Sequence, residues 1–177
     1  SLNPVGSSAS GFKATLFGGK HSFKNARFNA VANVSTSSVY VGGLFYYLNG
    51  AKIYDLSIAS SCVYSFASNR TTIAGTIAGY ADNTNLINCS SFANITVNNG
   101  GATVNNLEIQ VGGLIGSVQG SSIAFYLCSY KGTVTETAFS SALTSAADNL
   151  IRMGGFIGYT NNSVTSTILD GCYINVK

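Results

Sequence analysis

Residues 111–134 read VGGLIGSVQGSSIAFYLCSYKGTV, and two other stretches of the chain repeat this pattern. IAGTIAGYADNTNLINCSSFANITV begins at Ile73, and MGGFIGYTNNSVTSTILDGCYINVK begins at Met153. Each stretch has a pair of small residues, an apolar segment, a polar turn and a second apolar segment with a cysteine. Self-similarity at a period of about 20–50 residues is typical of solenoids and other repeat arrays.

The small-residue pairs set the spacing of the repeat. They align as Gly18-Gly19, Gly42-Gly43, Ala74-Gly75, Gly112-Gly113 and Gly154-Gly155, and their second members are 24, 32, 38 and 42 residues apart. This irregular spacing indicates a solenoid with loop insertions. Glycine weakens a strand, so its return at one place implies a tight corner or a close approach of neighbouring coils. We expect such corners at Gly43, Gly75, Gly113 and Gly155.

The segments between the glycines have the composition of strands. β-branched and aromatic residues dominate them, and Gly, Asn and Ser separate them. The sequence predicts an all-β fold, a right-handed parallel β-solenoid (β-helix) with about four to six irregular rungs. Residues 1–177 would form a single domain, in which 1–40 are an N-terminal cap or a degenerate rung and 41–177 are the repeats.

The repeats resemble the GLUG-type repeat. That pattern has a Gly-Gly-Leu-Val-Gly-Tyr-like opening, an Asn/Ser/Gly turn, a strand with Asn-Cys-Tyr or Asn-Ser-Tyr, and a Gly-x-Val ending. Asn88-Cys89-Ser90 stands at the signature place, whereas VGGLFYYLNGAKIYDLSI, from Val41, has the opening without the cysteine. The resemblance covers roughly residues 40–177. It implies a β-helical extracellular or cell-surface protein, often an adhesin or its stalk, and it brings no catalytic residues.

The composition suits a secreted or surface-exposed β protein. Charged residues make up 8% of the chain, against roughly 25% in ordinary domains, and 24 Ser, 15 Thr and 18 Asn supply the polarity. The net charge of +3 is too small to indicate a nucleic-acid partner, and no apolar run is long enough for membrane insertion. Residues 1–54 carry +5 and the remainder −2. This asymmetry is either a solvated face or a complementarity between subunits.

Three of the four cysteines recur at nearly the same place of the repeat. Cys89, Cys128 and Cys172 lie 14, 15 and 17 residues after the second small residue of their units, and Cys62 fits less well. They form either a ladder of buried thiols or disulfides between adjacent rungs. The chain has no CxxC motif and a single histidine, His21, so we expect no zinc site and no cofactor.

The residues that enzymes need are scarce, and we expect no catalytic site. His21 has no GxSxG motif near it, and the six acidic residues are scattered. Candidate glycosylation sites are Asn33, Asn69 and Asn161. Alternation along a strand places Tyr46 and Tyr47 on opposite faces, which leaves at least one of them exposed as a candidate sugar-binding residue.

These observations predict a non-enzymatic extracellular structural subunit. The ends of a solenoid are open strand edges, and the chain ends in the strand-like GCYINVK without a polar cap. Head-to-tail contacts between copies would give a filament, coat or stalk. The alternative is a carbohydrate- or surface-binding adhesin module that uses exposed Tyr and Asn on a solenoid face, with glycans as its partners.

Overall fold

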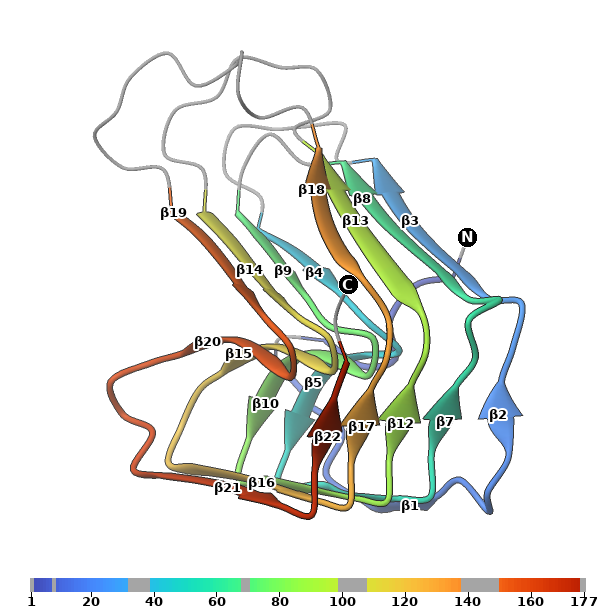
Figure 1. Ribbon diagram of the computed structural model, residues 1–177. Helices are drawn as coiled ribbons and strands as arrows, with labels where there is room; N and C mark the ends of the chain where they lie inside the picture. Colours follow the sequence, from blue (N-terminus) through green and yellow to red (C-terminus); the bar gives the residue numbers. More distant parts are fainter. Residues whose placement is uncertain are drawn as a thin grey trace.

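The chain is a parallel β-solenoid, as predicted. The computed structural model describes residues 2–7, 9–31, 39–67, 71–98, 108–137 and 150–175. These ranges contain 22 strands and no helix long and apolar enough to cross a membrane. Neighbouring strands run parallel, and each pairs with the strand five places before or after it. Figure 1 shows that the coils wind right-handed.

Each complete coil contributes one strand to each of five sheets (Figure 1). Sheet 1 contains β1 (Thr15–Phe17), β6 (Lys52–Tyr54), β11 (Thr84–Ile87), β16 (Ser122–Tyr126) and β21 (Ser166–Asp170). Sheet 2 contains β2 (Ser22–Phe23), β7 (Ser57–Ile58), β12 (Ser90–Ser91), β17 (Ser129–Tyr130) and β22 (Tyr173–Ile174). Sheet 3 contains β3 (Arg27–Val31), β8 (Val63–Ala67), β13 (Asn94–Asn98) and β18 (Val134–Thr137). Sheet 4 contains β4 (Tyr40–Gly42), β9 (Thr72–Ala74), β14 (Glu108–Gly112) and β19 (Leu150–Gly154). Sheet 5 contains β5 (Phe45–Asn49), β10 (Ala78–Asp82), β15 (Ile115–Val118) and β20 (Ile157–Thr160).

The coils differ in length. Lys52, Asn85, Ala124 and Ile168 occupy the same place in successive coils, so these coils are 33, 39 and 44 residues long. Most of the difference falls between the strands of sheet 3 and those of sheet 4. The first coil begins at β1, so part of the segment predicted as a cap or a degenerate rung forms strands that pair with the second coil.

The core consists of side-chain columns that run along the solenoid axis. Ile53, Leu86 and Phe125 lie opposite one another in sheet 1, and all three are fully buried. Lys52 and Asn85 alternate with them and point outward, because successive residues of a strand face opposite sides. Burying one large apolar side chain stabilises the fold by roughly 1.5–3 kcal/mol, so each column favours the stacking of neighbouring coils.

The small-residue pairs form the corner between sheet 4 and sheet 5. Gly43, Gly75, Gly113 and Gly155 all lie there, between the two strands of their coil. A Cβ atom on Gly75 would lie 2.6 Å from the Ala78 carbonyl oxygen and 2.6 Å from the Cα of Ile115. Backbone atoms of the same coil and of the next coil therefore occupy the space that a side chain would need.

The observed register corrects the alignment of these pairs. Val111 lies opposite Ala74, so the residue after Ala74, Gly75, is at the same place as Gly112. Gly112 in turn lies opposite Gly154, so Gly75 aligns with the first and not the second glycine of these pairs. The pair Gly18-Gly19 is at a different corner, between β1 and β2, and its alignment with the others was wrong. There the backbone of Asp55 leaves no room for a Cβ on Gly18.

A column of left-handed residues forms the corner between sheet 1 and sheet 2. The residue two positions before each of the last four sheet 2 strands has a positive φ. These residues are Asp55 (53°), Asn88 (53°), Leu127 (54°) and Gly171 (60°). Gly and Asn tolerate this conformation, but it costs other residues roughly 1–2 kcal/mol. The Asn88 side-chain nitrogen donates a hydrogen bond of 2.5 Å to the Asp55 carboxylate in the preceding coil.

Leu127 is the poorest match to this corner, and replacing it should stabilise the protein. We expect Leu127→Asn to raise the free energy of unfolding by about 1 kcal/mol, because asparagine tolerates the left-handed conformation. Leu127 is largely exposed, so little buried area is lost. Leu127→Ala is the control, since alanine keeps the backbone cost. Equal stabilisation of both variants in chemical denaturation would contradict the backbone explanation.

Two glycine substitutions separate close packing from backbone strain. Gly75→Ala should destabilise the fold by about 3 kcal/mol or more, because its Cβ would overlap the adjacent coil. Gly50→Ala should cost only about 1 kcal/mol, because Gly50 has a φ of 71° and no heavy atom within 4 Å of its Cβ position. Thermal or urea unfolding measures both, and a similar loss in the two variants would argue against the tight corner.

Candidate functional site

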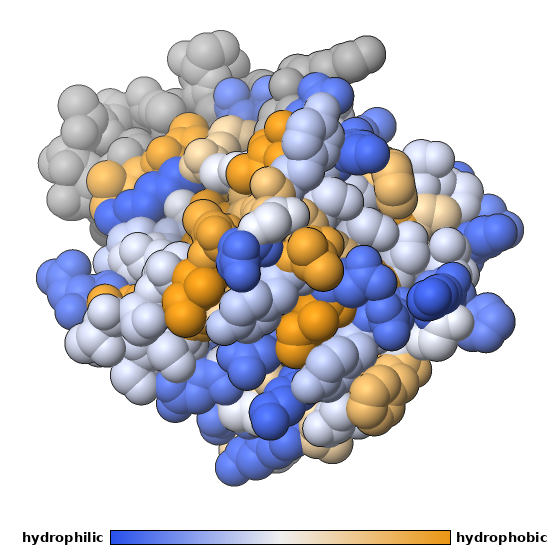
Figure 2. All heavy atoms as spheres, turned by 60° about the horizontal axis from the view of Figure 1, so that its bottom comes forward, coloured by the Kyte–Doolittle hydropathy of each residue, from blue (hydrophilic) through white to orange (hydrophobic). Residues whose placement is uncertain are grey.

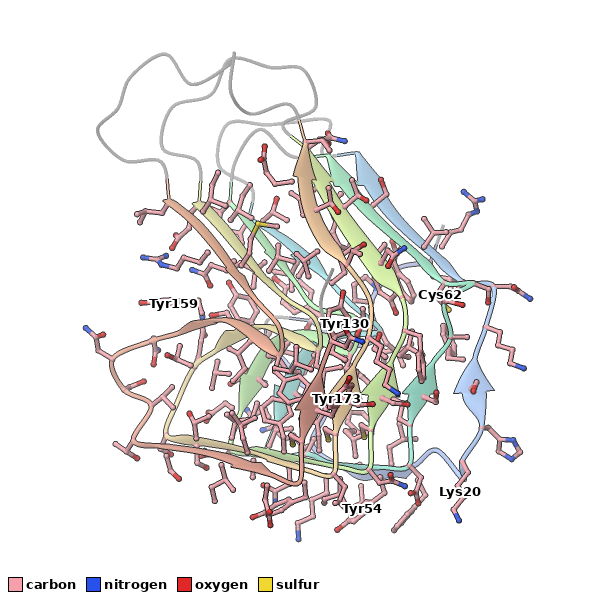
Figure 3. All side chains as sticks on the ribbon, viewed as in Figure 1. Lys20, Tyr54, Cys62, Tyr130, Tyr159 and Tyr173 are labelled. Carbon is pink, nitrogen blue, oxygen red and sulfur yellow. The ribbon has the colours of Figure 1, made fainter. Side chains whose placement is uncertain are left out.

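The C-terminal end of the solenoid exposes the inner side-chain columns. Leu169 continues the column of Phe125, yet it is 56% exposed whereas Phe125 is 0% exposed. Ile174 lies opposite Tyr130, and the two are 45% and 0% exposed. Figure 3 shows Tyr130 inside the coil. The described residues include no strand beyond β21 and β22 that would cover Leu169 and Ile174.

Sheet 4 ends in the same way. Ile151 and Met153 are exposed in β19, the last strand of sheet 4, whereas the residues opposite them in β14 are fully buried. Val134, Met153, Gly154 and Gly155 line a hollow of about 280 Å³ between β18 and β19. The C-terminal end of the solenoid, nearest the viewer in Figure 1, thus has exposed apolar side chains and this hollow. In Figure 2, where the lower side of Figure 1 is turned forward, apolar side chains form several patches between hydrophilic ones.

The N-terminal end is better covered than the C-terminal end. The Leu2 backbone N–H donates a hydrogen bond of 2.8 Å to the Arg27 carbonyl. Val5 pairs with Phe45, and Phe12 pairs with Leu48, along the free edge of β5. Phe28 lies in the first coil and is still only 1% exposed. The two ends of the described solenoid thus differ in how far the chain itself protects them.

The two ends also differ in charge. Lys13, Lys20, Lys24 and Arg27 lie in or beside the first coil, and residues 1–54 contain no acid. Residues 124–177 contain three basic and three acidic residues. The first coil is therefore strongly basic, but the last coil is neutral overall and is not an acidic counterpart to it.

Tyr46 and Tyr47 lie on the same side of β5, so the prediction of opposite faces was wrong. Phe45 and Leu48, three residues apart, are the buried residues of this strand. The reason is that Phe45 pairs with Ala78 and Tyr47 with Tyr80, whereas the residues between them, Tyr46 and Gly79, are not paired. This break interrupts the regular alternation of inward and outward side chains along the strand. Two consecutive side chains can then face outward.

The two tyrosines contribute to a small pocket on the outside of sheet 5. Val39, Tyr46, Tyr47, Tyr80 and Gln119 line this hollow of about 280 Å³. The ring centroids of Tyr46 and Tyr80 are 6.2 Å apart, and those of Tyr47 and Tyr80 are 6.3 Å apart. We call this hollow the tyrosine pocket.

Two phenols of the tyrosine pocket, those of Tyr47 and Tyr80, have raised pKa values. Burial and the neighbouring Asp82 carboxylate raise the pKa of Tyr47. Burial, with smaller contributions from Tyr46 and Glu108, raises the pKa of Tyr80 to about 12. The rings of Tyr47 and Tyr80 are therefore neutral at physiological pH.

Tyr80 and Gln119 were missed in the sequence analysis, although a signal for Tyr80 exists. Tyr47-Leu48-Asn49 in the first coil corresponds to Tyr80-Ala81-Asp82 in the second. Aligning these two segments of the sequence places Tyr47 and Tyr80 at the same position of the repeat. Gln119 follows a strand of the third coil, and no motif marks it.

Three cysteines form a column, and all four have free thiols. Cys89, Cys128 and Cys172 each follow the left-handed residue at the corner between sheets 1 and 2. The Cys128 Sγ–H donates to the Leu86 carbonyl oxygen at 3.3 Å, and Cys172 bonds to Phe125 in the same way at 3.4 Å. A hydrogen bond with Cys89 and then burial raise the pKa of Cys128.

Cys62 lies outside this column, at the corner between sheets 2 and 3 (Figure 3). Leu56 takes the place in the second coil that Cys89 takes in the third, as the pairing of Ser57 with Ser90 shows. The Cys62 thiol donates to the Phe23 carbonyl oxygen at 3.2 Å. The poorer fit of Cys62 to the spacing thus corresponds to a different corner.

The remaining candidate residues lie apart from these features. His21 is exposed, and the described residues contain no group of three or more His, Cys, Asp or Glu that could hold a metal ion. Asn161 is half-buried after β20, and its side-chain oxygen accepts hydrogen bonds from the Ser163 N–H and hydroxyl. Asn33 and Asn69 lie outside the described residues.

A scan against protein-family models gave no match for this chain, and no curated protein and no solved structure matched it. The resemblance to the GLUG-type repeat therefore stays a prediction.

The thiols differ in access, and alkylation can measure this. In the native protein iodoacetamide should label Cys172 alone, because Cys62, Cys89 and Cys128 are buried. Burial raises the pKa of Cys172, so its thiolate fraction is lower than that of an ordinary cysteine at a given pH. As the pH is raised, the labelling rate of Cys172 should therefore keep increasing at pH values where the rate of a free cysteine no longer changes. Fewer than four labelled cysteines after unfolding without reductant, counted by mass spectrometry, would indicate a disulfide.

Proposed function

We propose that the chain is a structural β-solenoid subunit that joins the next copy end to end. The C-terminal end of one copy would lie against the N-terminal end of another. The observation that carries the proposal is the exposure of Leu169 and Ile174, which continue columns that are fully buried in the preceding coil. Leaving such side chains in water costs roughly 1.5–3 kcal/mol each.

A second copy fits this end because its first coil repeats the same strand order. β21 and β22 have free edges in the described structure, and so do β1 and β2. Leu16 and Phe23 occupy the inner columns of the first coil. In a head-to-tail joint Leu169 would face Leu16, and Ile174 would face Phe23. Sheets 1 and 2 would then continue from one copy into the next at the ordinary strand spacing of about 4.8 Å.

Charge favours this arrangement over a joint between two N-terminal ends. The four cations of the first coil have no acid near them in the sequence, so two such coils would repel each other. The neutral C-terminal end has no such penalty. A heterologous joint of this kind leaves a free end of each type and so gives filaments unless the rotation closes a ring.

The proposal includes an extracellular location. Few charged residues, many Ser, Thr and Asn residues and the resemblance to a repeat of cell-surface proteins support it. A coat or stalk outside the cell requires no cofactor and no catalytic residue from this chain.

Assembly is tested by light scattering and electron microscopy over a range of protein concentrations. We expect filaments for the unmodified protein. Leu169→Asp should raise the concentration needed for assembly by about 100-fold or more, because an unpaired carboxylate buried in the joint costs roughly 3–5 kcal/mol. Ile168→Asp is the matched control, since Ile168 is on the same strand but continues the outward column of Lys52 and Asn85.

Two results would contradict the proposal. One is an unmodified protein that stays monomeric at all concentrations, which would leave the C-terminal end to a different partner. The other is equal inhibition by Leu169→Asp and Ile168→Asp, which would mean that added charge, and not the inner column, prevents assembly.

A further inference from the structure

We propose that the tyrosine pocket binds a small organic cation, such as a quaternary ammonium group. Three aromatic rings line one hollow, and the carboxylate of Asp82, on β10, interacts with the side chain of Tyr47. The inference is independent of end-to-end assembly, because the pocket is formed by the first three coils on the outside of sheet 5.

The rings form walls around the hollow and do not form a flat platform. The plane of Tyr46 is tilted by 46° against that of Tyr80, and the plane of Tyr47 is tilted by 79°. Both centroids lie little more than 6 Å from that of Tyr80. A cation is attracted to a ring face from within about 6 Å of its centroid. A compact charged group in the hollow can therefore contact all three rings at once.

Two of the three rings, those of Tyr47 and Tyr80, are held in place before any ligand arrives. Tyr47 and Tyr80 lie opposite each other on paired strands. The backbone at Gly11 presses against Tyr47, so that a Cβ there would lie 2.8 Å from the Tyr47 ring. A preformed site does not lose affinity to the ordering of its side chains.

The local charge favours a cation. None of the residues that line the pocket is a lysine or an arginine. The Asp82 carboxylate hydrogen-bonds with the Tyr47 side chain. Within the described ranges it has no ion-pair partner, and its Oδ1 is buried without a hydrogen-bond partner. The electron-rich ring faces and this carboxylate, which no cation neutralises within the described ranges, therefore add their attraction for positive charge.

A neutral sugar fits these observations less well. A pyranose ring stacks best on one flat, accessible aromatic face, whereas here the three ring faces turn in different directions. The Gln119 amide could bond to a hydroxyl group, but the charge of Asp82 would contribute little to a neutral ligand. The arrangement of the three rings therefore favours a cation over the glycan that was predicted as a ligand of this face.

Nuclear magnetic resonance titration of the intact chain tests the proposal with three probes. These are choline, its uncharged isostere 3,3-dimethylbutan-1-ol, and methyl β-glucoside. We expect choline to bind at least about tenfold more tightly than the isostere, because only the charged group gains the cation–π attraction. Equal binding of choline and isostere would overturn the proposal, and so would binding of the glucoside alone or of no probe.

Variants then locate the site. Tyr80→Leu should weaken choline binding by about tenfold, whereas Tyr80→Phe should preserve most of it, because phenylalanine keeps the ring face. Tyr126→Leu is the matched control, since Tyr126 is a half-buried tyrosine on the outside of sheet 1.

Asp82→Asn should also weaken choline binding while leaving the weak binding of the isostere unchanged. If Tyr80→Leu does not fold, Asp82→Asn and Tyr80→Phe test whether choline binds in the tyrosine pocket. Choline binding that survives in Asp82→Asn and Tyr80→Leu would overturn the proposal.

Discussion

Each coil of this solenoid can bury its inner side chains only against the coils on either side of it. Phe125 is fully buried because β11 and β21 flank its strand, and Leu169, one coil further on, is mostly exposed. Hydrophobic burial is the main favourable term in folding, so the stability of a coil depends on its neighbours more than on its own sequence. At the N-terminal end, residues Leu2, Val5 and Phe12 cover part of the free edge.

The same stacking decides which residues can form the corners. Parallel coils in register must turn at the same place, so each corner fixes one backbone conformation for a whole column. Asp55, Asn88, Leu127 and Gly171 differ chemically but share a left-handed φ. At the corner between sheets 4 and 5 the constraint is space, because backbones approach too closely for a side chain on Gly75. The cysteines next to the left-handed column fill a small volume and satisfy their thiols with carbonyl groups.

Much of the architecture could be predicted from the sequence, because the columns appear as a repeat. Parallel strands, irregular coils and the different place of Cys62 all follow from spacing. The failures have local causes. Tyr46 and Tyr47 share a side because the pairing skips a position at Gly79, which residue alternation does not reveal. Gly18-Gly19 imitates the later pairs but forms another corner. The tyrosine pocket combines residues from three coils, and such a combination depends on a register that only coordinates provide.

The unequal coil lengths separate two properties of the molecule. Most of the extra residues of the longer coils fall between sheets 3 and 4, while the inner columns keep their register in all coils. The cross-section of the solenoid and the length of the chain that forms it are therefore set independently. The number of residues between these two sheets can therefore change from coil to coil while the same inner positions remain stacked.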